Sequence, residues 1–451
     1  MPSPGSPTPN KRTSPTRDVV FDLLAVMAVA GVVLAAALVG RALKRAGVDI
    51  FLPFPPLLAE WLPHLGPGTV FAVLLAVGVV AWGPALAGRM GWRRLLLVGW
   101  AASFAWTLAL ALSDGYGKGF ATRLTSRDEY LHDVPLVTDI PAMLRDFTSH
   151  ILTDQPGAWT THVGAHPPGI FLLFVWLDRI GLGGGPAASA FCVVVGSSAC
   201  LAVAVAVRAL AGEDLARTVL PFSVLFPGAV WVGVSADGVF AAVLAWGVAG
   251  IAVASTRGGR VSALAATSSG VLLGFCLYLS YGLTLGAVLV LAVIAVTRSW
   301  RAALFAVLGV AAVVAVFTAA GFWWITGYEL TKVLYAGSIA QSRPYSYFIW
   351  ANLAALVLAL GPAVIAGLRR VAGSPRRWGY APVALVAAAL TAVLVADISG
   401  LSKAEVERIW LPFGTWLVVA CAWLPRAHWR GWLAAQAVLA LLVNHLLLTV
   451  W

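Results

Sequence analysis

Apolar runs of about 20 residues recur along the sequence, and this feature limits its possible folds more than any other. The first run covers residues 19–40, and similar runs follow as far as residues 430–450. Only 11% of the 451 residues are charged, whereas soluble domains carry roughly 25%. Such a chain cannot cover a soluble core with polar side chains. We therefore predict a polytopic membrane protein.

We predict an all-α bundle of about 13 transmembrane helices, because a helix satisfies its own backbone hydrogen bonds in lipid. The predicted spans lie near 19–40, 68–88, 95–113, 187–207, 216–233, 238–255, 261–279, 281–297, 302–325, 347–367, 380–397, 409–424 and 430–450. Residues 19–451 are expected to form a single membrane domain. The Pro- and Ser-rich residues 1–18 are expected to form a disordered cytoplasmic tail.

The net charge of +11 fits membrane topology rather than nucleic-acid binding. Lys and Arg collect at cytoplasmic helix ends, and the sequence has no basic stripe interleaved with aromatic residues. With a cytoplasmic amino terminus, 18 of the 30 Lys and Arg residues fall on the inner side. This orientation requires the short apolar stretch 167–182 to lie half-inserted or along the outer surface. It predicts a multi-pass plasma-membrane protein whose residues 114–166 form one large extracytoplasmic loop.

The predicted loop 114–166 holds much of the titratable chemistry. Seven of the 19 acids and four of the seven histidines lie in it: Asp114, Asp128, Glu129, Asp133, Asp139, Asp146, Asp154, His132, His150, His162 and His166. Solvation of a loop explains most of these residues. The adjacent carboxylates Asp128 and Glu129 can do more, because one can accept a proton from an attacking hydroxyl while the other tunes its pKa or orients the acceptor.

A second motif, His166-Pro167-Pro168-Gly169, leads directly into an apolar helix. Proline at a helix start is already in the helical conformation and loses no needed donor. Helix entry therefore explains the prolines, but it does not explain a histidine at the membrane surface.

These motifs resemble those of the membrane-embedded GT-C glycosyltransferases, which use sugars carried on polyprenyl phosphate. Members carry an Asp-Glu pair in the first large outer loop, then a Pro-Pro helix entry and a further acid in the next outer loop. Here the matching positions are Asp128-Glu129-Tyr130, His166-Pro167-Pro168-Gly169 and Asp237, and residues 268–282 resemble the family's Gly-rich hairpin. The resemblance covers roughly residues 95–300. The acidic loop follows the third predicted span instead of the first, which two extra amino-terminal helices would explain.

The resemblance implies a glycosyltransferase similar to actinobacterial mannosyl- and arabinosyltransferases. Such an enzyme moves mannose or arabinose from a polyprenyl-phosphate donor to a glycan or protein acceptor of the cell envelope, at the outer membrane face. By the family match, Asp128 is the catalytic base, Glu129 lies beside it, and Asp237 positions the acceptor or donor.

A phosphate leaving group needs cations, for which Arg offers bidentate contacts and Lys a point charge. "SKAEVERIW" at 402–410 places Lys403 and Arg408 at the outer end of a predicted helix. Local ion pairs at a solvated helix end are the alternative explanation, although each is worth only about 0–1 kcal/mol. The complete predicted substrate-binding set is Tyr130, His132, His166, Lys403, Arg408, Glu405, Arg343 and Lys118.

No tight metal-ligand motif occurs in the sequence, so we predict no required cofactor or metal. A divalent ion held by His132 and His166 with Asp128 or Asp237 stays an open alternative. So do two other functions, a multi-pass transporter or lipid flippase and a non-catalytic partner in cell-wall assembly. A transporter predicts midplane charges and an inverted repeat. The enzyme hypothesis instead predicts that Asp128 and Asp237 lie together, facing Lys403 or Arg408 across a groove.

Overall fold

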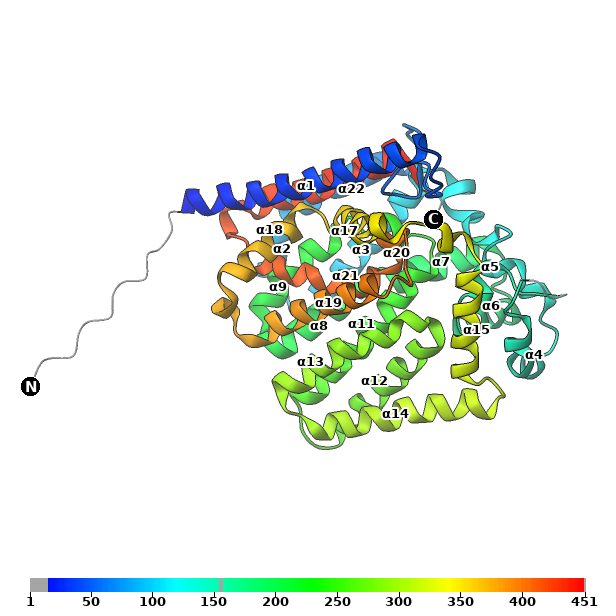
Figure 1. The fold of residues 1–451 in the computed structure, drawn as a ribbon. Coiled ribbons are helices and arrows are strands. Elements are labelled where there is room, and N and C mark those ends of the chain that lie inside the picture. Colours follow the sequence, from blue (N-terminus) through cyan, green and yellow to red (C-terminus); the bar gives the residue numbers. More distant parts are fainter. Residues whose placement is uncertain (1–14, 154–156, 450–451) are drawn as a thin grey trace, which may run out of the picture.

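The computed structural model describes residues 15–153 and 157–449 as a bundle of long helices (Figure 1). The first helix, α1 (Pro15–Arg45), includes residues 15–18 of the predicted tail in its first turn. The remainder of that tail, residues 1–14, and Asp154 of the predicted loop lie outside the described residues.

Eight helices in the described part of the chain are long and apolar enough to cross a membrane. They are α1, α2 (Gly68–Arg89), α3 (Trp92–Ser113), α7 with α8 (Gly185–Gly196 and Ala199–Ala211), α11 (Ala236–Ser255), α12 (Gly259–Leu279), α14 (Trp300–Ala319) and α19 (Tyr380–Ile398). A ninth arises if α17 (Tyr345–Leu360) and α18 (Pro362–Gly373), bent by 107°, count as one span. A multi-pass, nearly all-α protein is therefore confirmed, whereas the larger predicted number of spans is not.

Several predicted spans form shorter or interrupted helices. Within 216–233, α9 (Glu213–Val224) ends shortly before Pro227-Gly228, and α10 (Ala229–Val232) is a single turn. Within 281–297, the 3-10 helix η6 (Tyr281–Gly286) precedes α13 (Ala287–Thr297). A helix of the length of α9 extends about 18 Å, well short of a hydrocarbon core of roughly 30 Å. Counting apolar residues does not detect these interruptions, because the residues at each break are themselves mostly apolar.

The carboxyl-terminal part follows the same pattern. Its elements are η7 (Pro375–Trp378), α20 (Val406–Ile409), α21 (Leu411–Leu417), η8 (Val418–Trp423), η9 (Arg426–His428), α22 (Trp429–Leu446) and β2 (Leu447–Thr449). The strand β2 pairs antiparallel with β1 (Ala59–Trp61), in a register that places Ala59 opposite Thr449. This pair ties residues 46–67, between α1 and α2, to residues that follow α22.

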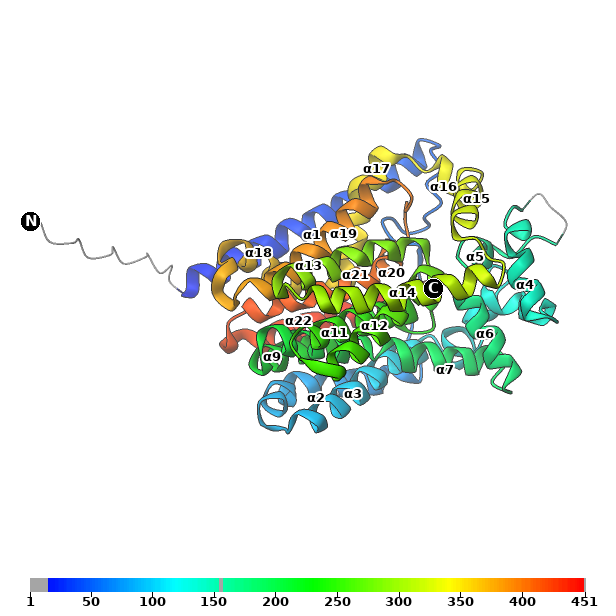
Figure 2. The ribbon, with the colours of Figure 1, turned by 90° about the horizontal axis from the view of Figure 1, so that it is seen from below.

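Residues 114–153 and 157–184 lie at one end of the bundle. Figures 1 and 2 show α4 (Ile140–Asp146), α5 (Thr161–Gly164) and α6 (Gly169–Arg179) gathered there near α15 (Trp324–Ala336) and α16 (Ile339–Ser342). Five short helices complete the segment: η1 (Gly117–Ala121), η2 (Arg123–Thr125), η3 (Tyr130–His132), η4 (Val134–Leu136) and η5 (Phe147–His150). The 11 residues of α6 extend about 16 Å, too short to cross. We call this end the loop end and the opposite end, where α1 begins, the amino-terminal end.

Small residues let two of the long helices approach closely. A Cβ added to Gly309 of α14 would lie 2.3 Å from the carbonyl oxygen of Thr267, and one added to Gly270 of α12 would lie 2.1 Å from that of Ala306. Membrane helices associate through van der Waals contact across such small residues. Gly270, within the predicted hairpin at 268–282, therefore serves helix packing, and the chain turns at Ser280 into η6.

Candidate active site

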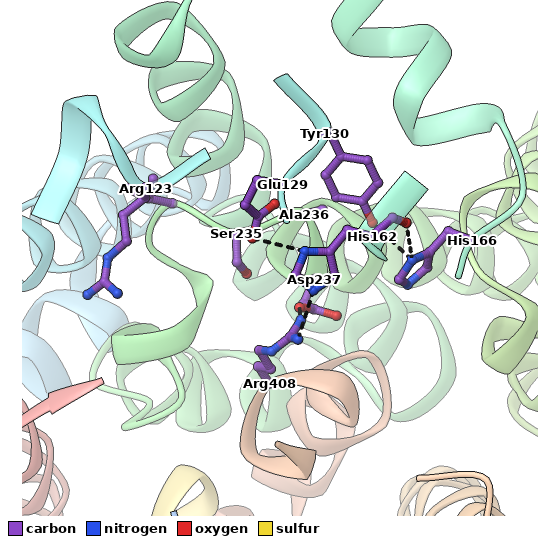
Figure 3. A pocket seen from close by; sticks show the side chains of 10 residues that line it. Arg123, Glu129, Tyr130, His162, His166, Ser235, Ala236, Asp237 and Arg408 are labelled. Atoms are coloured by element: carbon purple, nitrogen blue, oxygen red, sulfur yellow. Dashed lines mark hydrogen bonds and ion pairs between the residues drawn. The ribbon is translucent and has the colours of Figure 1, made fainter. Parts of the chain in front are cut away.

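A pocket at the loop end collects polar side chains from three separate parts of the chain (Figure 3). Residues 123–166 contribute Arg123, Glu129, Tyr130, His162 and His166. The turn into α11 contributes residues 234–237, and α20 contributes Arg408. The tertiary fold thus brings together groups separated by as many as 285 positions in the sequence.

Arg408 lines this pocket and is only 8% exposed. Its Nη1 donates to Oδ2 of Asp237 at 2.7 Å, and its Nη2 donates to Oε2 of Glu405 at 2.7 Å. Burial by itself lowers the pKa of Arg408, but the two carboxylates outweigh burial and raise that pKa above its ordinary value. Arg408 is therefore a permanent cation held between two acids.

His162 connects Arg408 to the other pocket carboxylate. Its Nε2 lies 3.4 Å from Nη2 of Arg408, and its Nδ1 lies 3.3 Å from Oε1 of Glu129. Glu129 is 6% exposed and Asp237 is 4% exposed, so both carboxylates are shielded from bulk water. Electrostatic interactions in such a shielded site are stronger than in water.

Tyr130 and His166 form a second pair along the pocket wall. The hydroxyl of Tyr130 lies 3.1 Å from Nδ1 of His166, and this nitrogen also lies 2.9 Å from the carbonyl oxygen of His162. Burial, followed by the charges of Glu129 and Asp237, raises the pKa of Tyr130 well above 10.0. Burial, with a smaller contribution from His162, lowers the pKa of His166 to about 4. At neutral pH the pair is thus an intact phenol and a neutral imidazole.

The α11 helix places Asp237 where a negative charge is stabilised. Asp237 lies in the first turn of this 20-residue helix, at the positive end of the helix macrodipole. Ser235 precedes the helix, and its hydroxyl donates to the carbonyl oxygen of Trp231 at 2.7 Å. Asp237 thus lies at the amino-terminal end of α11, where its carboxylate accepts a hydrogen bond from Arg408 at 2.7 Å.

Two short segments with strained backbone lie beside the pocket. Among the described residues, five non-glycine residues have a positive φ, and three of them lie here: Val234 at 62°, Ala404 at 72° and Glu405 at 62°. A β-branched residue such as Val is a rare occupant of this region. Each strained residue costs about 1–3 kcal/mol, and such residues concentrate at functional sites. The rest of the fold must therefore hold these segments in place.

The structure sorts the predicted site residues into three groups. The first lines the pocket: Glu129, Tyr130, His166, Asp237 and Arg408. The second is linked to Arg408 by a chain of contacts, in which Glu405 contacts Arg408, Arg343 contacts Glu405, and Lys403 accepts a hydrogen bond from Arg343. The third is exposed and does not line the pocket: Asp128, His132 and Lys118.

Asp128 therefore does not share the pocket with Asp237, contrary to the geometry that we predicted for the enzyme. Its Oδ1 accepts a hydrogen bond from the hydroxyl of Thr161 at 3.0 Å, while the next side chain, Glu129, is buried in the pocket. The residue pair was found from the sequence, but only the conformation at 126–130 determines which carboxylate faces inward.

Sequence reasoning missed His162 as a site residue, and it offered Arg123, like Lys118, only as a further candidate cation for the phosphate. The spacing offered a signal for His162, because residues four apart lie on one face of a helical turn and His166 follows four positions later. Arg123 donates to Oδ2 of Asp114 at 2.9 Å and to the carbonyl oxygen of Thr449 at 2.7 Å. No local pattern predicts that contact with a residue 326 positions away.

Among residues 15–153 and 157–449, no three His, Cys, Asp or Glu side chains are grouped so that they could hold a metal ion. In the pocket, the positive charge beside the carboxylates comes from Arg408.

No family model matches this chain, and no curated protein or solved structure matches it either. The resemblance to GT-C glycosyltransferases therefore rests on the sequence motifs, with the pocket geometry as a separate observation.

Proposed function

We propose that this protein is a GT-C-like glycosyltransferase that moves mannose or arabinose from a polyprenyl-phosphate donor to an acceptor of the cell envelope. One observation carries the proposal: Glu129, Asp237 and Arg408, from distant parts of the chain, meet in one buried pocket at a bundle end. This combination offers a carboxylate for proton removal and a cation for a phosphate leaving group.

The distribution of charge supports an outward-facing site in the plasma membrane. Among the described residues, the amino-terminal end carries sixteen Lys and Arg and four Asp and Glu, whereas the loop end carries twelve Lys and Arg and fourteen acids. Basic residues collect on the cytoplasmic side. The loop end, which includes the pocket, is then extracytoplasmic.

In the proposed reaction, the acceptor hydroxyl attacks the anomeric carbon of the sugar. The bond from that carbon to the phosphate oxygen breaks, and the lipid phosphate leaves with the electron pair. Glu129 takes the hydroxyl proton, because its carboxylate lies in the pocket and Asp128 does not. Arg408 stabilises the departing phosphate, while Asp237, bonded to Arg408 at 2.7 Å, orients the guanidinium.

Tyr130 and His166 are suited to hold the sugar or the acceptor. The phenol keeps its proton and can donate, since its pKa is well above 10.0. If the Nδ1 proton of His166 serves the carbonyl oxygen of His162, Nε2 is an acceptor for a sugar hydroxyl.

A transporter is the second candidate, because a hydroxyl-lined cavity lies where helices are interrupted. The junction of α7 with α8 and the interruption after α9 both border it. Its hydroxyl side chains are Ser103, Thr107, Ser197, Ser223 and Thr415. Interrupted helices form substrate sites in many transporters. Of the described residues that line this cavity, none is charged, so the charged pocket favours the enzyme.

The adjacent carboxylates supply a matched pair of variants for the test. The full-length protein would be reconstituted in vesicles, and transfer from polyprenyl-phosphate mannose and arabinose to an envelope acceptor would be measured. We expect Glu129→Gln to lower transfer by about 10²–10⁴-fold and Asp128→Asn to lower it less than threefold. The reverse order would restore Asp128 as the base. No transfer by folded wild type with any donor, together with solute movement across the vesicle membrane, would favour the transporter.

A further inference from the structure

Glu405 lies between two buried arginines. Its Oε2 accepts a hydrogen bond from Nη2 of Arg408 at 2.7 Å, and its Oε1 lies 3.6 Å from Nη1 of Arg343. Burial by itself raises the pKa of Glu405, but Arg408 and Arg343 outweigh burial and lower it. The carboxylate therefore stays negative and holds the space that separates the two guanidinium groups.

Arg343 has donor capacity that its protein contacts do not use. The residue is 5% exposed, and its Nε is buried without a hydrogen-bond partner. Its Nη1 donates to the carbonyl oxygen of Lys403 at 2.6 Å, and its guanidinium lies 5.9 Å from the ring centroid of Phe348. A buried donor without a partner is destabilising, because it has lost its hydrogen bond to water. An anion with more oxygens than a carboxylate can satisfy that donor.

The backbone that carries Glu405 is strained. Ala404 and Glu405 both have left-handed φ angles, of 72° and 62°, and the four-residue helix α20 follows directly. For a residue other than glycine, the left-handed backbone conformation is higher in energy than the helical or extended conformations. Release of the Glu405 side chain from the two arginines would let these two residues relax.

We propose that Glu405 is a placeholder for a phosphate group, which displaces it and binds between Arg343 and Arg408. The ligand is a phosphate monoester on a lipid or free phosphate, both of which carry the charge and the oxygens that two arginines bind. This inference rests on the proposed function, because it assigns the arginine pair to the lipid phosphate that leaves in the proposed transfer and that becomes a monoester when the sugar departs. In the ligand-free protein, the carboxylate of Glu405 itself occupies the phosphate site. The cost of displacing this carboxylate therefore weakens the binding of phosphate.

Glu329 provides a matched control for substitutions of Glu405. Glu329 also pairs with a cation three residues later, at 2.6 Å from Nζ of Lys332, and it also lies at the loop end. Its pair is exposed on α15.

The experiment measures binding of a polyprenyl monophosphate and, separately, of inorganic phosphate to the full-length protein in nanodiscs. A placeholder that occupies the site about nine-tenths of the time weakens the apparent affinity about tenfold. We therefore expect Glu405→Gln to bind polyprenyl monophosphate about tenfold more tightly than wild type, and Glu329→Gln to bind like wild type. Glu405→Asp, which keeps the charge but shortens the side chain, should also bind more tightly.

Each outcome decides the inference. Tighter binding of both probes by the Glu405 variants identifies the phosphate group itself as the ligand, and tighter binding of the lipid probe alone identifies a lipid headgroup. Unchanged or weaker binding of both probes by folded Glu405→Gln and Glu405→Asp overturns the placeholder. Tighter binding without sugar transfer by wild type would instead overturn the glycosyltransferase and leave the placeholder standing.

Discussion

Buried clusters of arginine and carboxylate lie at both ends of this molecule. At the amino-terminal end, Asp22 is fully buried and lies 3.0 Å from Nη1 of Arg369 and 2.6 Å from Nη2 of Arg370. At the loop end, Arg408 is buried and lies 2.7 Å from both Asp237 and Glu405. In the first cluster Asp22 pairs with two arginines, and Asp18 also pairs with Arg369. In the second, Arg408 pairs with two acids, and Glu405 also pairs with Arg343.

The surroundings of the two clusters differ more than the ion pairs do. Asp22 and its arginines belong to regular parts of α1 and α18, and they fasten these two helices together. The cluster at Arg408 borders a pocket, two histidines and strained backbone. A buried ion pair by itself is weak evidence of function, because structural networks also contain such pairs. The pocket and the strain are what mark the second cluster as a site.

Of the substitutions that distinguish the two clusters, Arg408→Lys should have the largest effect on sugar transfer. Lysine keeps the charge but cannot contact two carboxylates through a planar fork. Loss of one preorganised donor at a developing negative charge lowers rates by about 10²–10³-fold, so we expect a loss of that size in transfer. Arg370→Lys at the other cluster should leave transfer within a factor of three. Equal losses in the two variants would mean that the clusters do not differ in function.

Asp22→Asn should have the opposite profile. Removal of one partner from a buried ion pair costs about 3–5 kcal/mol, because the remaining charge is uncompensated. We expect a lower melting temperature in detergent, together with normal transfer per folded molecule at a lower temperature. A variant with full stability, or one that folds normally but transfers no sugar, would contradict a purely structural role.

The smallest expected effect is a pH dependence of stability due to His166. Its pKa in the fold is about 4, against an ordinary value of 6.5. Between these values the unfolded chain binds a proton that the folded chain does not, so stability falls as the pH drops from 6.5 to about 4. His166→Asn should remove about 3 kcal/mol of that fall, because each pKa unit corresponds to about 1.4 kcal/mol, as measured by melting temperature across this pH range. His132→Asn, at an exposed histidine of the same segment, is the control.

Residues 216–233 and 347–367 show why the sequence overstates the number of spans. Both runs are apolar enough to cross, but a Pro-Gly pair interrupts the first, and Gly361-Pro362 bends the second by 107°. Glycine at 361 adopts a φ of 81°, a conformation that suits residues without a Cβ. Hydropathy averages over such breaks, whereas backbone geometry depends on the single residues.

Composition by itself determined that this chain enters a membrane as a bundle of helices, because scarce charge and long apolar runs leave few other structures in which the backbone is satisfied. The local motifs also identified five of the side chains that line the pocket: Glu129, Tyr130, His166, Asp237 and Arg408.

Only the tertiary structure decided which of the candidates meet. It turned Glu129 inward and Asp128 outward, added His162, and placed Glu405 between Arg343 and Arg408. These contacts join residues as far apart as His162 and Arg408, which are separated by 246 positions. Sequence patterns report neighbours within a few residues, whereas a pocket depends on how whole helices pack and on where the chain between them bends.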